Sequence, residues 1–153
     1  MTHVKSEQDG GKTPAWWMVL APFLVMAVIF GFSSRSQLPD LDGGRDLQNV
    51  IGHFAVYAAL GASLALLFRA IGWGVLRSLL CAVVLATLYG VSDEFHQSFV
   101  PNRNVDPRDV LVDFLGATGG ALAMLRLLDY RATYRHARDE APIEDDEGPK
   151  PGR

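Results

Sequence analysis

Long apolar segments alternate with short polar stretches along the chain. Four such segments run from about Ala15 to Phe32, Asn49 to Phe68, Ser78 to Val100 and Val110 to Leu128. A helix needs about 20 mostly apolar residues to cross a hydrocarbon core of about 30 Å. The pattern therefore predicts an all-α polytopic membrane protein with four transmembrane helices in a bundle.

The third segment differs from the other three because its apolar part is short. The uncharged stretch from Ser78 to Ser92 has 15 residues and reaches only about 22 Å as a helix. To cross the membrane, the helix must also include Asp93, Glu94, His96 and Gln97. An isolated acidic residue at mid-bilayer costs about 2.5–3.5 kcal/mol, so we expect these groups to lie near one end of the helix and to be paired.

The chain divides into three parts. Residues 1–13 form a polar, flexible leader, residues 14–128 hold the four-helix membrane domain, and residues 129–153 form a charged tail that we expect to be disordered. Lys5 and Lys12 ahead of an apolar run also match the start of a signal peptide. The run is long for a signal peptide and no cleavage site is evident, which favours a retained anchor.

Composition narrows the class of protein. The chain has 153 residues, of which 49% are apolar, and a single cysteine, Cys81. One cysteine excludes a disulfide framework and a Cys-rich zinc or iron–sulfur site. The net charge of −3 gives no indication of a nucleic-acid surface. We therefore expect the lipid bilayer, and no nucleic acid, as the partner.

The basic residues predict the orientation in the cytoplasmic membrane. Four crossings place both termini on one side, together with Lys5, Lys12, Arg69, Arg77, Arg126, Arg131, Arg135 and Arg138. The other side holds Arg35, Arg45, Arg103 and Arg108. Eight basic residues against four favour cytoplasmic termini. The polar ends of the second, third and fourth helices then all lie in the outer leaflet.

Three distant parts of the sequence bring unusual polar residues to this outer end. Residues four apart share a helix face, as His53 and Tyr57 do on the second helix, and Asp109 and Asp113 on the fourth. Arg103 lies in the short connection between the third and fourth helices. The predicted polar site comprises His53, Tyr57, Asp93, Glu94, His96, Gln97, Arg103, Asp109 and Asp113.

These nine residues admit more than one interpretation. Such groups can bind a cation, recognise a polar head group, relay protons or perform acid–base chemistry. Alternatively, the network is purely structural: His53 is a packing residue, Asp109 a charge favoured at a helix N-terminus, and Asp113 a partner of Arg103 or His96. Histidine and carboxylates at helical spacing suit a divalent metal, but no HExxH-type signature specifies one, and the sequence names no cofactor.

Small residues predict where helices approach each other closely. Gly116 and Gly120 form a small-xxx-small face on the fourth helix, and Gly61 and Ala65 repeat the pattern on the second. In lipid, such faces allow two helix backbones to come into contact. We expect both faces to pack against other helices of the bundle.

Two stretches of the chain resemble the VanZ-like family of small bacterial membrane proteins. They read IGHFAVYAALG and LYGVSDEFHQSFVPNRNVDPRDVLVDFLGATGG, and the resemblance extends from about Gln48 to Leu125. The matching residues are His53, Tyr57, Asp93, Glu94, His96, Gln97, Pro101, Arg103, Asp109 and Gly116. The family commonly has Asn where Asp113 stands, and often Asp-Lys shortly before the first histidine, where this chain has Asn49, Val50 and Ile51.

The resemblance implies an envelope protein whose founding relative is associated with resistance to the glycopeptide teicoplanin. The leading hypothesis is that the outer polar site interacts with a lipid-linked or cell-wall-related ligand and alters glycopeptide sensitivity. The alternative is a membrane-embedded hydrolase or transferase, with His96 or His53 as acid–base and Asp93, Glu94 or Asp113 as partners or metal ligands. A proton-linked transporter is a third class, which four short helices disfavour unless the protein forms oligomers. The sequence therefore leaves open whether the protein is an enzyme.

Overall fold

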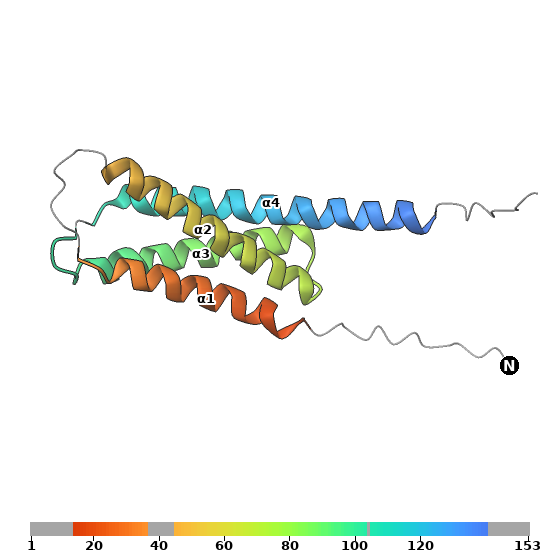
Figure 1. Cartoon of the computed structure of the whole chain (residues 1–153), viewed down its shortest axis with the longest axis horizontal. Helices are drawn as coiled ribbons and strands as arrows, with labels where there is room; N and C mark the ends of the chain where they lie inside the picture. Colours follow the sequence, from red (N-terminus) through yellow and green to blue (C-terminus); the bar gives the residue numbers. More distant parts are fainter. Residues whose placement is uncertain (1–13, 37–44, 104, 141–153) are drawn as a thin grey trace, which may run out of the picture.

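The computed structural model describes residues 14–36, 45–103 and 105–140. It contains four helices, α1 (Trp16–Ser33), α2 (Arg45–Ala70), α3 (Val75–Gln97) and α4 (Pro107–Asp139), packed side by side (Figure 1). All four are long and apolar enough to cross a membrane. The prediction of an all-α, four-helix polytopic membrane protein is therefore confirmed. The expected leader (1–13) and the last part of the expected tail (141–153) lie outside the described residues.

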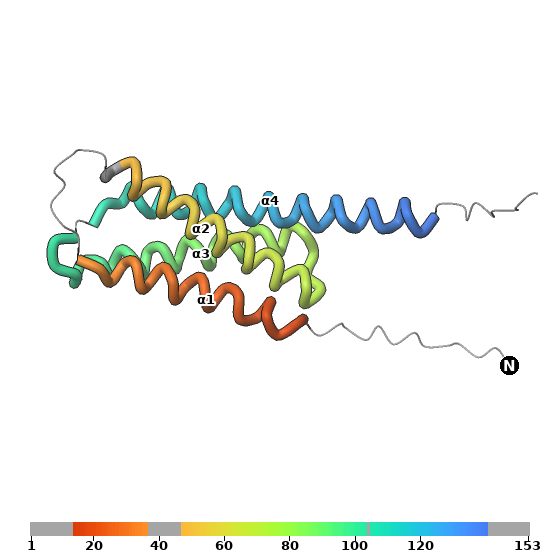
Figure 2. Tube along the Cα trace, in the orientation of Figure 1, coloured from red at the N-terminus to blue at the C-terminus, as the bar shows by residue number. Residues whose placement is uncertain are grey.

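Two helices are longer than their apolar segments predict. Helix α2 begins at Arg45 rather than Asn49, because hydropathy does not detect a first turn that is mostly polar. Helix α4 has 33 residues and continues to Asp139, so that residues 129–139 of the expected disordered tail are helical. At about 50 Å, α4 exceeds the hydrocarbon core by about 20 Å, and it runs past the other helices (Figure 2). His136 and Arg138 in its last turn suit the negative end of the helix dipole.

The four helices share two common ends. Helices α1 and α3 end where α2 and α4 begin, and we call this end of the bundle the site end. Both ends of the described chain lie at the opposite end (Figure 1). Helix α2 shares its largest interface with α4, whereas α1 packs against α2 and α3 and, among the described residues, does not reach α4. Helix α1 is thus the outermost member of the bundle.

Glycines set the spacing between α2 and α4. A Cβ atom added at Gly120 would lie 1.9 Å from the carbonyl oxygen of Ala58, and one at Gly116 would lie 2.5 Å from that of Phe54. In the other direction, a Cβ at Gly61 would lie 2.2 Å from the carbonyl oxygen of Ala117. The two backbones are therefore in direct contact, as the small-xxx-small pattern predicts.

Side-chain size is arranged with small residues inside and large ones outside. The fully buried positions include Ala65, Ala82, Ala86, Ala117 and Ala121, whereas Leu24, Leu76, Leu88, Phe95 and Phe99 are exposed. In water, so much exposed apolar surface would be unfavourable. In a bilayer the large side chains face lipid tails, and the small ones allow close helix packing. The distribution thus fits the membrane environment that the hydropathy pattern predicts.

The connection between α3 and α4 is fixed by local sequence. Pro101 disfavours continuation of α3, and Asn102 adopts a left-handed conformation with φ of 61°, which asparagine tolerates better than most residues. Asp106 then caps α4 by accepting a hydrogen bond from the backbone N–H of Arg108, with Pro107 in the first turn. This short turn holds Arg103 beside the site end.

Candidate functional site

All four helices contribute polar side chains to one cluster at the site end. We call this set the polar cluster; its members are Ser33, His53, Tyr57, Asp93, Glu94, Gln97, Asp109 and Asp113. Tyr57 and Asp113 have no exposed surface, and Asp93, Glu94 and Gln97 are at most 5% exposed. Four carboxylates on two helices are thus brought together within an apolar bundle.

His53 joins α2 to α4 through two carboxylates that lie one turn apart. Its Nδ1 atom lies 2.9 Å from Asp113 Oδ1, a hydrogen bond in which the ring N–H can donate to the carboxylate. Its Nε2 atom lies 3.9 Å from Asp109 Oδ2. The imidazole is therefore oriented by Asp113, with its other nitrogen toward Asp109.

Asp93 forms a separate network that joins α3 to α1. Ser33 Oγ donates to Asp93 Oδ2 at 2.6 Å, and Gln97 Nε2 donates to the same oxygen at 2.8 Å. Gln97 Nε2 also lies 3.4 Å from Ser33 Oγ. Both donors reach the same carboxylate oxygen, so this part of the cluster is largely satisfied internally.

Glu94 lies on the α4 side of the cluster and is only half satisfied. Its Oε2 atom accepts a hydrogen bond from the backbone N–H of Asp106 at 3.2 Å. Its Oε1 atom is buried and has no hydrogen-bond partner among the described residues. Glu94, His53 and Asp109 each offer one ligand atom, and these three atoms lie within 4.8 Å of one another. Among the described residues, this trio is the group of side chains best placed to hold a metal ion.

His96, which the sequence assigns to the polar site, contacts residues outside the cluster. Its Nε2 atom lies 3.1 Å from Ser34 Oγ, and its ring stacks on Phe30 with centroids 4.7 Å apart. Phe30 belongs to α1 and Ser34 is its C-cap residue, and the hydrogen bond to Ser34 is exposed. His96 therefore helps to attach α1 to α3, and His53 is the histidine of the cluster.

A pocket of about 280 Å³ opens beside the cluster, between α1 and α2. Its lining residues are Ile29, Phe32, Ser33, Gln48, Asn49, Gly52, His53, Val56, Tyr57, Asp93 and Arg103. Two buried atoms of this lining, Tyr57 Oη and Arg103 Nε, have no hydrogen-bond partner in the described part of the chain. Both can donate a hydrogen bond.

Some residues of the site carry no strong sequence signal. Ser33 is an ordinary small residue at the end of an apolar segment, and Gln48 and Asn49 precede the second one. Only their position, at the same membrane depth as His53, indicates from the sequence that they could belong to the site. Asp106 contributes only its backbone N–H to Glu94, and no side-chain pattern reveals such a contact.

Comparison with known proteins agrees with this architecture. A family model described as VanZ/LLP1 matches residues 1–128. The chain belongs to the VanZ/LLP1 family. The match includes the whole polar cluster and confirms the resemblance seen in the sequence, and it ends before the helical extension of α4. Comparisons with curated proteins and with solved structures give no significant match.

Proposed function

We propose that this VanZ/LLP1 protein binds the polar head of a lipid-linked, cell-wall-related molecule in the pocket between α1 and α2. The observation that carries the proposal is the pair of unpartnered buried donors, Tyr57 Oη and Arg103 Nε, in the lining of one pocket. A buried donor without a partner costs about 1–3 kcal/mol. A ligand that supplies acceptor oxygens removes this cost at both positions.

The donors favour a phosphate as the acceptor. An arginine guanidinium matches a phosphate with parallel hydrogen bonds and keeps its charge at any physiological pH. Asp93 also lines the pocket, but its Oδ2 atom already accepts from Ser33 and Gln97. The amides of Gln48 and Asn49 complete a lining that suits the hydroxyl groups of a sugar.

The size and depth of the pocket favour a head group attached to a lipid chain. Pockets for whole small molecules measure about 300–1,000 Å³, so 280 Å³ suits a phosphate or sugar phosphate. Ile29, Phe32 and Val56 supply an apolar part of the lining, next to helix faces that carry exposed apolar side chains. An amphiphile can thus keep its chain in the bilayer while its head enters the pocket.

The binding test compares two arginines at the same end of the protein. Purified wild-type protein should bind a polyprenyl phosphate, and Arg103→Gln should weaken binding about 10- to 100-fold, because a hydrogen bond to a charged group contributes about 1.5–3 kcal/mol. Arg108→Gln is the control, because Arg108 is exposed and does not line the pocket. Native mass spectrometry with the phosphate, the uncharged polyprenol and phosphatidylglycerol measures the selectivity. An equal loss of affinity in Arg103→Gln and Arg108→Gln, or equal binding of all three lipids by the wild type, would contradict the proposal.

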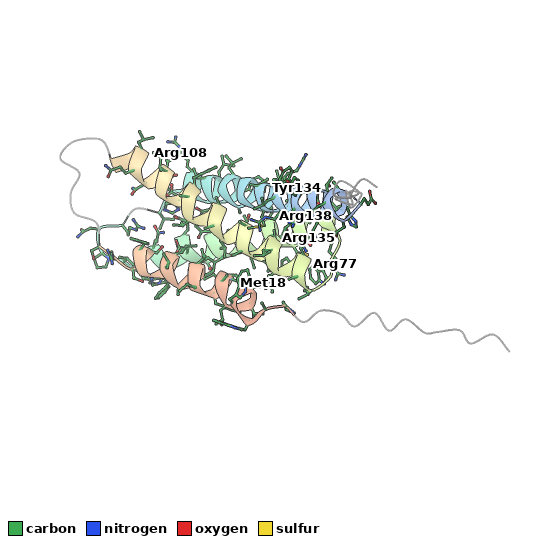
Figure 3. The ribbon with its side chains drawn as sticks, turned by 45° about the vertical axis from the view of Figure 1, so that its right-hand side comes forward. Met18, Arg77, Arg108, Tyr134, Arg135 and Arg138 are labelled. Carbon is green, nitrogen blue, oxygen red and sulfur yellow. The ribbon has the colours of Figure 1, made fainter. Side chains whose placement is uncertain are left out.

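We further propose that the site end faces the outside of the cytoplasmic membrane. Arg77, Arg135 and Arg138 lie toward the opposite end, whereas Arg108 lies at the site end (Figure 3), and the greater number of basic residues favours the cytoplasm for the opposite end. A cysteine introduced as Ser36→Cys, in a Cys81→Ser background, should therefore react with an impermeant maleimide in intact cells. Ala137→Cys in the same background should react only after permeabilisation. The reverse pattern of labelling would invert the orientation.

In the cell, binding of such a ligand in the pocket should alter glycopeptide sensitivity. Strains that carry wild-type protein, Arg103→Gln or no protein are compared for growth in teicoplanin. We expect Arg103→Gln to behave as the strain without protein, although its abundance in the membrane is normal. If the Arg103→Gln strain has the same teicoplanin sensitivity as the wild-type strain, glycopeptide sensitivity does not depend on the pocket.

The His53–Asp113 pair favours a second candidate function, a membrane-embedded hydrolase or transferase. A histidine held by a buried carboxylate at 2.9 Å can act as a general base, and His53 also lines the pocket. Water would then attack a phosphorus atom of the ligand, the P–O bond to the leaving group would break, and His53 would accept the water's proton. Release of inorganic phosphate from polyprenyl diphosphate by wild-type protein, and its loss in His53→Asn, tests this function.

A further inference from the structure

We propose that His53 Nε2, Glu94 and Asp109 form a binding site for a divalent metal ion such as Mn²⁺ or Zn²⁺, and that Asp113 positions His53 for it. The three ligands come from α2, α3 and α4. Of the three ligands only His53 lines the head-group pocket, and the metal site does not depend on Tyr57 or Arg103, the two donors that carry the proposed function.

The spacing of the three side chains fits one metal ion. Their ligand atoms lie within 4.8 Å of one another. Atoms bound at about 2.0–2.2 Å to one ion lie at most about 4.4 Å apart. Small rotations of three side chains would close the difference, without movement of the helices that carry them.

The buried acceptor on Glu94 gives a second, independent reason for a cation. Glu94 is 5% exposed, and its Oε1 atom has no hydrogen-bond partner in the described residues. Neither Glu94 nor Asp113 forms an ion pair with a lysine or arginine in that part of the chain. A carboxylate near the membrane interior is costly unless it is paired, and a bound cation supplies the missing charge.

Asp113 is a positioning residue for this site. Metal-binding histidines almost always hydrogen-bond a carboxylate, carbonyl or water through the ring nitrogen that does not bind the metal. Asp113 Oδ1 accepts that hydrogen bond from His53 Nδ1 at 2.9 Å, while Nε2 faces Asp109. Gly90 on α3 leaves room for this carboxylate, since a Cβ there would lie 2.7 Å from Asp113 Oδ2.

The ligand types indicate the kind of metal. One imidazole with two carboxylates is a mixed nitrogen and oxygen set that suits Mn²⁺ or Zn²⁺. Mg²⁺ and Ca²⁺ prefer oxygen ligands alone, and a site for a soft ion such as Cu(I) would contain sulfur. Three protein ligands also leave coordination positions for water or a ligand atom.

The test uses the full chain, purified in mild detergent, freed of metal and titrated with Mn²⁺ alone. We expect electron paramagnetic resonance to detect one bound Mn²⁺ per chain, displaced by Zn²⁺ but not by Mg²⁺. Asp113→Asn should weaken binding by about 10- to 100-fold, the effect typical of outer-shell partners. Asp109→Asn should weaken it further, because it removes a direct ligand. Spin-echo modulation should detect a bound imidazole ¹⁴N in the wild type, and Asp113→Asn should alter that coupling.

Asp93→Asn is the control, because Asp93 is a neighbouring carboxylate, 3% exposed against 5% for Glu94, whose partners are Ser33 and Gln97. It should bind Mn²⁺ as the wild type does. Circular dichroism and gel filtration establish that each variant is folded, and Glu94→Gln replaces Asp109→Asn if that variant is not. Absence of Mn²⁺ and Zn²⁺ binding by the wild type, or equal weakening by Asp93→Asn, would overturn the site. Because the probe is the metal alone, a failure of the head-group proposal leaves this result unaffected.

Discussion

Replacing Gly120 by alanine is expected to push α4 away from α2 and to destabilise the bundle severely. The added methyl carbon would lie 1.9 Å from the backbone oxygen of Ala58. No change of rotamer can relieve a clash with backbone, so one whole helix must move. Overpacking typically costs about 1–3 kcal/mol and occasionally more, and we expect this substitution at or above the upper end of that range.

Gly119→Ala is the matched control for this prediction. It lies one residue away on the same helix, and its added methyl carbon meets only the end of the Phe54 ring, at 3.8 Å. Alanine favours a helix over glycine by about 1 kcal/mol, so Gly119→Ala should be neutral or stabilising. Thermal unfolding of the two variants in the same detergent measures the difference. Equal midpoints would mean that α2 and α4 are not in backbone contact.

Hydropathy alone predicts most of the fold. A segment that must cross a membrane needs a fixed length of apolar residues, so the four helices are visible as four segments. The same rule does not apply beyond the membrane, and hydropathy therefore does not predict the helical extension of α4 to Asp139. Helix formation there depends on local propensity and end charges, which leave no apolar signature.

Membrane depth likewise predicts which residues meet, but not how they pair. The sequence places His53, Asp113 and Glu94 at one end of the bundle, where the structure has them. It offers Arg103 or His96 as the partner of Asp113, whereas the partner is His53. That choice depends on the close approach of α2 and α4 at Gly116 and Gly120, a distance that no single helix specifies.

His96 illustrates the same limit. It lies only three residues from Asp93, and both point from α3 toward α1, yet Asp93 binds Ser33 and His96 contacts Ser34 and Phe30. Whether a side chain enters the cluster or stays at its margin depends on the exact rotation of α3 about its axis. Periodicity gives that rotation only to within part of a turn.

Glu94→Gln tests whether the polar cluster is a binding site or only supports the bundle. Glutamine keeps an acceptor for the Asp106 N–H but removes the charge of a buried carboxylate with an unpartnered oxygen. We therefore expect the variant to be as stable as the wild type or more so, because binding sites are commonly not optimised for stability. Its affinity for Mn²⁺ should fall by more than the about 10- to 100-fold typical of an outer-shell partner, because a direct ligand is lost.

The decisive measurement is the midpoint of thermal unfolding, with and without Mn²⁺, for wild type, Glu94→Gln and the exposed control Asp129→Asn. Ligand at 100 times its dissociation constant stabilises a protein by about 2.7 kcal/mol. We predict that Mn²⁺ raises the midpoint of the wild type and of Asp129→Asn but not that of Glu94→Gln, whose midpoint without metal equals or exceeds that of the wild type. A lower midpoint for Glu94→Gln, with no effect of Mn²⁺ on any of the three proteins, would contradict the account and identify the cluster as structural.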